Sequence, residues 1–337
     1  MKIGVIGAGA VSRVHINAYS KRQDVQIAGI ADLNEKAAKA LADKYEVPQI
    51  TVDYHHFLED KSIQVVDICL PHFLHHQVTL EAFEAGKDVI LEKPISMTIE
   101  EADDMITTAE KKGRRFFVAL NQRFLPAHQR AKELLSNGEI GKPFFCLAVC
   151  IGDEMPRMDD PTSWKGTWDK AGGGAMADTG THFIDLMHYF FGLPNAVTAT
   201  MKRLVVTAEN KADDCSTVTL EFPDNFMAEV VVTYAATSDI WSEKKDIYGL
   251  NGSIHICNEA EKPLFIVKDK GSPQYLEVEH NPVWWEYSVG RGVNHFVDCI
   301  LQDKEPIVRP EEAKLTLQTI LSAYRASKEG RRLELNY

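Results

Sequence analysis

The sequence predicts an α/β domain built on a parallel sheet, followed by an α+β domain with a large, mostly antiparallel open sheet. Two observations along the 337 residues support this prediction. Up to about residue 120, short apolar runs alternate with helical patterns, as in a parallel sheet covered by helices on both faces. After about residue 122, alternating strands are separated by turn residues. We therefore expect one domain over residues 1–122 and a second over residues 123–337.

Five apolar runs predict the strands of the first domain, at residues 2–6, 26–31, 65–70, 88–92 and 115–120. Periodic apolar spacing predicts four helices between them, at residues 10–21, 34–46, 73–85 and 98–112. Thr98 and Glu101 form a start signal for the last helix, and Gly113 is its stop signal. His55-His56 is expected in a solvated loop. Ligands of parallel sheets bind at the carboxyl ends of the strands, so the residues that follow strands are the candidate site residues.

The first strand runs into a glycine turn, MKIGVIGAGAVS. Gly7 permits a tight turn, Gly9 lets the backbone approach phosphates, and the following helix start offers free N–H groups. Ser12 takes the third position of the motif and is small enough for close packing. Together these features indicate a dinucleotide site, and the alternative is an ordinary strand–turn–helix with a capping acid. The residues predicted to bind the cofactor here are Gly7, Ala8, Gly9, Ala10, Val11 and Asp32.

Asp32 decides which dinucleotide is expected. It ends the second strand 25 positions after Gly7, near the spacing of an acid that holds the ribose hydroxyls. A carboxylate repels a 2′-phosphate, and no Arg follows it in Leu33-Asn34-Glu35. We therefore expect NAD as the cofactor, with NADP disfavoured.

Further candidates follow the other strands. They are Leu70, Pro71, His72 and His75 after the third strand, Glu92 and Lys93 after the fourth, and Asn121 after the fifth. The histidines are expected to contact the cofactor or to make polar contacts at a helix start. Lys93 has two interpretations: a surface ion pair with Glu92, or an amine directed into the ligand crevice by Pro94. In the crevice, the amine would stabilise negative charge on a reacting oxygen.

The second domain is predicted to combine seven strands with four helices. The strands are expected at residues 143–151, 196–206, 214–222, 226–235, 244–249, 253–257 and 263–268, and the helices at 126–136, 178–191, 290–302 and 311–328. An open sheet with helices on one face leaves a second face to cover, so we expect a homodimer or homotetramer formed through this sheet. Substrate selectivity is expected to depend on the loops 152–174 and 236–243.

A polar stripe marks the start of the helix near 178–191. Asp178, His182 and Asp185 are spaced to lie on one helix face, while most of the other residues are apolar and must be buried. His182 suits a general base, and Asp178 could orient it or bind a hydroxyl. The alternatives are a hydrogen-bonded network and a metal site made of these three residues. We expect no metal. Before this helix, Trp164 and Trp168 are expected to stack on a sugar ring or simply to pack.

Composition restricts the classes of function. The net charge is −12, which argues against a nucleic-acid partner. No apolar stretch is long enough for a membrane span, and the first strand begins at residue 2, so we expect no membrane association and no targeting segment. The six cysteines include no CxxC pair, which is typical of reduced thiols in a cytoplasmic protein.

The motifs together resemble the Gfo/Idh/MocA family of NAD(P)-dependent oxidoreductases, which includes inositol dehydrogenases and glucose–fructose oxidoreductase. The resemblance runs over nearly the whole chain and is most specific in the EKP and DTGTH stretches. It rests on GAGAVSRVH (7–15), CLPHFLHH (69–76), AGKDVILEKP (85–94), NQRFLPA (121–127), GEIGKPF (138–144), SWKG (163–166) and GGGAMADTGTHFIDL (172–186). His72 stands where relatives often carry Asn.

The resemblance implies roles for individual residues. Lys93, Asp178 and His182 would be the catalytic group and would also bind substrate, with His182 exchanging the hydroxyl proton. Glu92 would reach the nicotinamide side of the cofactor, and Trp164-Lys165 would contact the cofactor. Arg123 would face the substrate, and Trp168 joins the predicted substrate contacts.

We therefore expect a dehydrogenase that moves hydride between NAD and a secondary alcohol or ketone of a sugar, polyol or inositol. Lys93 and His182 are expected to act on one carbinol beside the pyridine ring. Two alternatives stay open: an NAD-dependent glycoside hydrolase of the same fold, acting by oxidation and elimination, and a non-catalytic regulator that senses NAD or a sugar.

Overall fold

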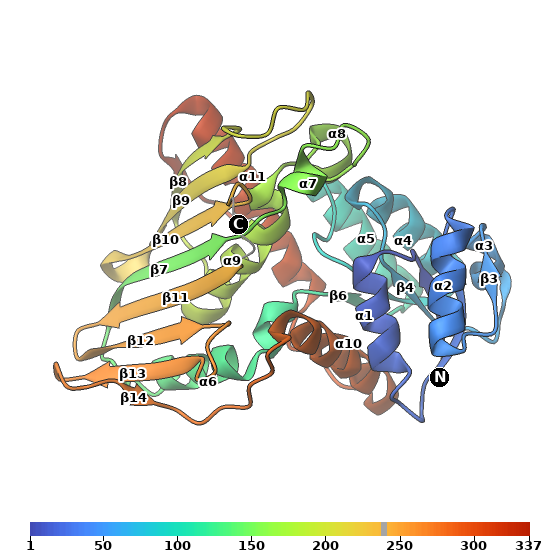
Figure 1. The fold of residues 1–337 in the computed structure, drawn as a ribbon, viewed down its shortest axis with the longest axis horizontal. Coiled ribbons are helices and arrows are strands. Elements are labelled where there is room, and N and C mark those ends of the chain that lie inside the picture. Colours follow the sequence, from blue (N-terminus) through green and yellow to red (C-terminus); the bar gives the residue numbers. More distant parts are fainter. Residues whose placement is uncertain (237–240) are drawn as a thin grey trace. The chain divides into compact units, whose positions relative to one another are not determined.

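The computed structural model describes residues 1–236 and 241–337, which form two compact units (Figure 1). The first unit contains Met1–Asn121 and Trp285–Lys314, and the second contains Gln122–Trp284 and Leu315–Tyr337. The first unit thus includes a segment near the C-terminus that the sequence analysis assigned to the second domain. Residues 237–240, within the loop expected to influence selectivity, lie outside the described residues.

The first unit is built on a six-stranded parallel sheet with the order β3-β2-β1-β4-β5-β6. Its strands are β1 (Lys2–Ile6), β2 (Gln26–Ala31), β3 (Ile50–Thr51), β4 (Val65–Ile68), β5 (Asp88–Leu91) and β6 (Phe116–Val118). Its helices are α1 (Ala10–Tyr19), α2 (Glu35–Tyr45), α3 (His55–Glu59), α4 (His75–Glu84), α5 (Ile99–Lys112) and most of α10 (Trp284–Gln302), with a 3₁₀ turn at His72–Leu74. The strand order reverses between β1 and β4, which is where doubly wound sheets bind ligands.

Several expected elements of this unit are confirmed, and others are corrected. The Thr98–Glu101 capping box and the left-handed Gly113 bound α5 as expected. The expectation of a loop at His55-His56 is wrong, because these residues begin α3, although their side chains are exposed. Strand β3 was not expected.

The second unit contains a nine-stranded sheet with the order β14-β13-β12-β11-β7-β10-β9-β8-β15. Its strands are β7 (Pro143–Ile151), β8 (Ala196–Lys202), β9 (Cys215–Phe222), β10 (Phe226–Thr233), β11 (Ser242–Gly249), β12 (Gly252–Cys257), β13 (Leu264–Lys268), β14 (Gln274–Tyr275) and β15 (Leu333–Glu334). Its helices are α6 (Pro126–Ser136), α7 (Met155–Met158), α8 (Trp168–Ala171), α9 (Ala175–Phe191) and most of α11 (Pro310–Glu329), with 3₁₀ turns at Asn121–Phe124 and Pro223–Asn225. The neighbours β7 and β10 are parallel and the other neighbouring strands are antiparallel, so the expected mostly antiparallel sheet is confirmed.

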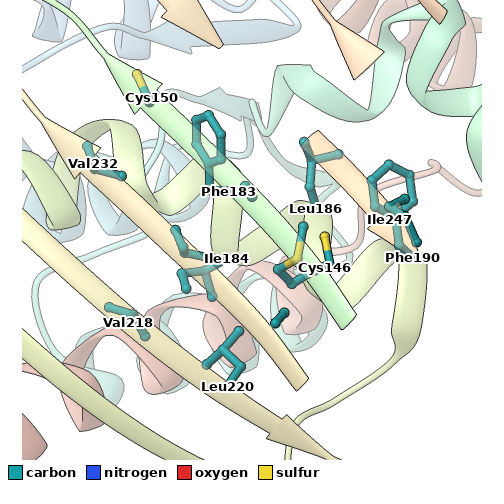
Figure 2. Close-up of a cluster of buried hydrophobic side chains, with 14 of the residues drawn as sticks. Cys146, Cys150, Phe183, Ile184, Leu186, Phe190, Val218, Leu220, Val232 and Ile247 are labelled. Carbon is teal, nitrogen blue, oxygen red and sulfur yellow. The ribbon is translucent and has the colours of Figure 1, made fainter. Parts of the chain in front are cut away.

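Helix α9 packs its apolar residues on the inner face of this sheet. Figure 2 shows Phe183, Ile184, Leu186 and Phe190 among side chains from β7, β9, β10 and β11. The strands supply every second residue to this core, which is the period of a half-buried strand. Because this core holds α9 on the sheet, the polar side chains of the same helix have defined positions.

The outward-facing residues of the same sheet include an aromatic cluster. The His255 ring stacks on Phe265 with centroids 4.5 Å apart, and Phe145 stacks on Tyr248 at 6.3 Å. These side chains are partly exposed and alternate along the strands with buried core residues. Among the described helices, none is long and apolar enough to cross a lipid bilayer.

Candidate functional site

The glycine turn after β1 has the backbone geometry that a dinucleotide phosphate needs. Gly7 has a φ of +108°, and a Cβ there would collide with the carbonyl of Cys69. A Cβ at Gly9, by contrast, would meet nothing within 4 Å, so the backbone is open on that side. Helix α1 starts at Ala10 without a side-chain cap and without an acidic residue in its first turn. Its first turn thus carries no acidic side chain of its own, and the positive end of the helix fits an anionic pyrophosphate.

Ser12 and Asp32 stabilise this turn by hydrogen bonds. The Gly9 N–H donates to Ser12 Oγ at 3.1 Å, so the serine at the third motif position holds the turn by its hydroxyl. Asp32 Oδ2 accepts the Ala8 N–H at 2.6 Å, and its Oδ1 accepts the Asn34 N–H at 2.7 Å. The structure thus joins Asp32 to the glycine turn.

His75 joins the segments that follow β4 and β5. The ring is buried, with Nδ1 at 2.8 Å from the Pro94 carbonyl oxygen and Nε2 at 2.9 Å from that of Leu70. Burial lowers the pKa of His75, while the hydrogen bonds to the two carbonyls act in the opposite direction. The neighbouring His72 is also buried, with its ring centroid 5.6 Å from that of His75. At the end of β6, Asn121 Nδ2 donates to Ser288 Oγ at 2.6 Å.

A buried polar cluster connects α1 with the ends of β4 and β5. His15 Nδ1 lies 2.8 Å from Asp67 Oδ2, and His15 Nε2 lies 3.1 Å from Glu92 Oε1. Tyr19 donates its hydroxyl to the same Asp67 oxygen at 2.9 Å. The sequence analysis missed His15, Tyr19 and Asp67. A usable signal was present, because an aspartate inside an otherwise apolar strand of a parallel sheet must have a partner.

The same cluster includes a candidate set of metal ligands. His15, Asp67 and Cys69 place one ligand atom each within 4.8 Å of the others. Burial, followed by the Asp67 charge, raises the pKa of Cys69 to about 12, which keeps the thiol protonated at neutral pH. A protonated thiol and a hydrogen-bonded His–Asp pair are poor metal ligands, so we interpret the group as a hydrogen-bonded cluster.

In the second unit, Asp213 and Tyr324 fix the start of α9. Asp213 accepts the N–H groups of Gly174 and Met176 at 3.0 and 2.9 Å, and Tyr324 donates its hydroxyl to the same carboxylate at 2.6 Å. A Cβ at Gly173 would collide with the Tyr324 hydroxyl, and one at Gly174 would collide with the Asp213 backbone. Glycines are therefore required at these two positions because Tyr324 and the Asp213 backbone lie too close for a side chain.

Asp178, in the first turn of α9, is held by two donors. Lys165 Nζ lies 2.8 Å from Asp178 Oδ2, and the Tyr234 hydroxyl donates to the same oxygen at 2.7 Å. Lys165 also lies 3.4 Å from Glu154 Oε2. Burial alone would lower the pKa of Lys165, but the carboxylates of Asp178 and Glu154 outweigh it and raise that pKa. Lys165 is thus a charged partner of Asp178, a contact that the sequence analysis did not anticipate.

The other two residues of the polar stripe, His182 and Asp185, differ in burial. His182 lies one turn after Asp178 on α9 and is partly exposed. Asp185 is fully buried and binds Arg123 through three contacts of 2.6 to 3.1 Å. Since Asp178 and Asp185 are each paired with a cation, the arrangement disfavours the metal site considered for the stripe. Trp168 is 52% exposed and packs edge-on against Tyr324, with ring centroids 5.0 Å apart.

The structure thus brings the sequence-predicted residues together in two groups. The glycine turn, Asp32, Leu70, His75, Glu92 and Lys93 belong to the first unit, and Arg123, Lys165, Asp178 and His182 belong to the second. Within the second group, Lys165 contacts Asp178, while Arg123 contacts Asp185. A parallel sheet with this glycine turn defines a dinucleotide-binding protein of the Rossmann class.

Comparison with known proteins identifies the family. A model described as an oxidoreductase family with an NAD-binding Rossmann fold matches residues 1–120, and a GFO/IDH/MocA C-terminal domain model matches residues 128–255. The chain therefore belongs to the Gfo/Idh/MocA family of oxidoreductases, and its first domain binds NAD. Both were expected from the sequence and are confirmed.

Individual relatives are named as dehydrogenases. A myo-inositol 2-dehydrogenase of Thermotoga maritima is 24% identical over 99% of this chain and 98% of its own length. A levoglucosan dehydrogenase of Pseudarthrobacter phenanthrenivorans is 32% identical over 60% of this chain and 54% of its own length. A solved levoglucosan dehydrogenase, in complex with NADH and levoglucosan, matches the whole chain with a TM-score of 0.90 at 22% identity. The structural likeness confirms the fold of the two domains.

Proposed function

We propose that the protein is an NAD-dependent dehydrogenase that acts on a secondary alcohol of a sugar, polyol or inositol. The observation that carries the proposal is the start of α9, where Lys165 and Tyr234 hold Asp178 one turn before His182. A fixed carboxylate beside a partly exposed imidazole is suited to binding a hydroxyl and removing its proton. The names of the relatives, which include levoglucosan and myo-inositol dehydrogenases, support the same substrate class.

The catalytic roles follow from the chemistry of each side chain. NAD, when bound, accepts the hydride of the carbinol. His182 takes the hydroxyl proton, Lys93 donates a hydrogen bond to the oxygen as negative charge develops, and Asp178 fixes the geometry. Trp168 offers an exposed ring face to a sugar, and Arg123 stays a predicted substrate contact that also fixes α9 through Asp185.

The proposed cofactor contacts begin with the glycine turn. The turn at Gly7 to Val11 would hold the pyrophosphate, and Asp32 would select NAD over NADP by its charge. The remaining proposed contacts are Leu70, Pro71, His72, His75, Glu92, Lys93, Asn121, Trp164 and Lys165.

A substrate panel tests the function. Sugars, polyols and inositols are incubated with NAD or NADP, and the absorbance of the reduced nicotinamide is followed. We expect turnover of at least one secondary alcohol with NAD, and loss of that turnover in Lys93→Ala and His182→Ala while NAD binding persists. Lys36→Ala, at an exposed position of α2, is the matched control for Lys93→Ala and should keep wild-type activity.

Other outcomes would contradict the proposal. Wild-type-like turnover in Lys93→Ala or His182→Ala would refute the assigned roles. Release of an aglycone that requires NAD but changes no absorbance would favour the hydrolase alternative. Binding of NAD and sugar without turnover of any compound would favour a regulator.

The aromatic cluster on the outer face of the nine-stranded sheet supports self-association. An apolar sheet face of this kind is covered in a stable protein, and a second copy of the chain is the proposed partner. Phe265→Glu should lower the mass measured by light scattering to that of a smaller assembly, and an unchanged mass would argue against this face as the interface.

A further inference from the structure

The position of His15 is not explained by cofactor binding through the glycine turn. The side chain lies on α1 beyond the turn, is fully buried, and directs both ring nitrogens at carboxylates. A carboxylate accepts hydrogen bonds and cannot donate them, so each nitrogen facing an ionised carboxylate must carry a proton. The geometry therefore favours the doubly protonated ring. Burial opposes that charge, but the Asp67 carboxylate outweighs it and raises the pKa of His15 well above its ordinary value.

Glu92 connects this cluster to the proposed catalytic lysine. Its Oε1 faces His15 Nε2 at 3.1 Å, and its Oε2 accepts the backbone N–H of Lys93 at 3.2 Å. Glu92 follows β5, and Asp67 lies within the neighbouring strand β4. His15 therefore ties the carboxylate beside Lys93 to a buried anchor in the middle of the sheet.

We propose that His15 is a positioning residue, held as an imidazolium between Asp67 and Glu92, which fixes the Glu92 carboxylate and through it the backbone of Lys93. The kinetic part of this inference rests on the proposed function, and the spectroscopic part does not.

Two variants test the contacts of the two His15 ring nitrogens separately. In His15→Asn the amide nitrogen replaces Nδ1 and still donates to Asp67, but it does not extend to Glu92. In His15→Gln the longer side chain restores a donor near the position of Nε2. We expect His15→Asn to lower kcat by about 10- to 100-fold with KM changed by less than about threefold. His15→Gln should recover part of this loss.

Tyr19→Phe is the matched control. Tyr19 lies on the same helix, and its hydroxyl donates its one proton to the same Asp67 oxygen rather than to Glu92. It should lower the thermal midpoint, as His15→Asn does, and leave kcat within about twofold of the wild type. Equal kcat values in His15→Asn and Tyr19→Phe would overturn the positioning role and leave a purely structural one.

Nuclear magnetic resonance tests the same inference without substrate. Long-range ¹H–¹⁵N spectra of the wild type at pH 7 should show both His15 nitrogens protonated. The amide resonance of Lys93 should shift in His15→Asn and stay in place in Tyr19→Phe. A neutral His15 ring, or an unchanged Lys93 amide in His15→Asn, would refute the proposal. If no substrate were found, the proposed function would fail, and these spectra would still decide the role of His15.

Discussion

Replacing Asp213 with Asn should weaken both the fold and the proposed catalytic helix. The buried carboxylate accepts four hydrogen bonds, two at each oxygen. At Oδ1 the donors are Gly174 N–H and Tyr324 Oη, and at Oδ2 they are Met176 N–H and Ser216 Oγ. An amide keeps only one acceptor oxygen, so two of these donors face an NH₂ group.

The loss of stability depends on which of the four donors can find another hydrogen-bond partner. A hydroxyl can rotate to accept from the new NH₂ group, but a backbone N–H cannot. If the amide nitrogen takes the Oδ1 position, Gly174 keeps its second acceptor, Tyr324 Oη, at 3.0 Å, and the Tyr324 hydroxyl loses its own acceptor. One donor thus stays buried and unpaired, which costs about 1–3 kcal/mol. Loss of a negative charge at a helix start adds about 0.3–1 kcal/mol. We therefore expect Asp213→Asn to lower the free energy of unfolding by about 1–4 kcal/mol.

Urea unfolding, followed by circular dichroism, measures this loss, and steady-state kinetics at a temperature where the variant is folded measure its effect on turnover. Because Asp178 and His182 lie in the first turns of α9, kcat should fall by about tenfold or more. Ser216→Ala removes one donor from the same carboxylate and leaves the two backbone contacts intact, so kcat should be unchanged. A wild-type urea midpoint and kcat in Asp213→Asn would refute the idea that this carboxylate positions the helix.

Three further predictions concern charge. Arg123→Met removes the buried cation that pairs with Asp185 and should lower the free energy of unfolding by about 3–5 kcal/mol. Arg123→Met combined with Asp185→Leu should recover most of the loss, and equal losses in both proteins would contradict a buried ion pair. Burial and Arg123 lower the pKa of His188 to about 3, so below about pH 6.5 the unfolded chain binds a proton that the folded chain does not. The free energy of unfolding should therefore fall as the pH drops from about 6.5 toward 3. His188→Asn should reduce this acid sensitivity in urea titrations. The double variant Asp32→Ser, Leu33→Arg should favour NADP, and Leu33 is 89% exposed, so the new arginine has room. The ratio of kcat/KM for NADP to that for NAD should rise by at least about tenfold, which corresponds to roughly 1.4 kcal/mol. An unchanged ratio would show that the Asp32 charge does not select the cofactor.

Local signals were sufficient for much of the fold. The bounds of β1, β2, α6 and β7 coincide with the predicted ranges 2–6, 26–31, 126–136 and 143–151. Prolines at Pro126 and Pro143 mark two of these starts, because they fix the backbone where an element begins. The two-residue strand β3 and the five-residue helix α3 were missed, since so few residues show no period.

Other bounds depend on residues distant in sequence. The predicted strand 196–206 ends at Lys202, because the Asp214 carboxylate takes the N–H groups of Leu204, Val205 and Val206 away from any ladder. Helix α9 begins at Ala175 instead of 178, because Asp213, 39 residues beyond Gly174, binds its first N–H groups.

The candidate site also contains features that the sequence predicts and features that it does not. The glycine turn and Asp32 were recognisable from spacing alone, and the structure joins them by a short hydrogen bond. Tyr234 lies 56 residues after Asp178, and no local pattern links the two. Partners that meet only through the sheet register therefore could not be predicted from one sequence.

The parallel pair at the centre of the nine-stranded sheet has a consequence for how the chain acquires its structure. Cys146 on β7 is registered with Ala228 on β10, about 80 residues later, while β8, β9 and β10 pair in sequence. Closing so long a loop costs more entropy than forming a hairpin, so the β8–β9–β10 meander should form first and β7 should dock onto it afterwards. Until that docking, the meander exposes an unpaired edge, and this is the stage at which aggregation competes with folding.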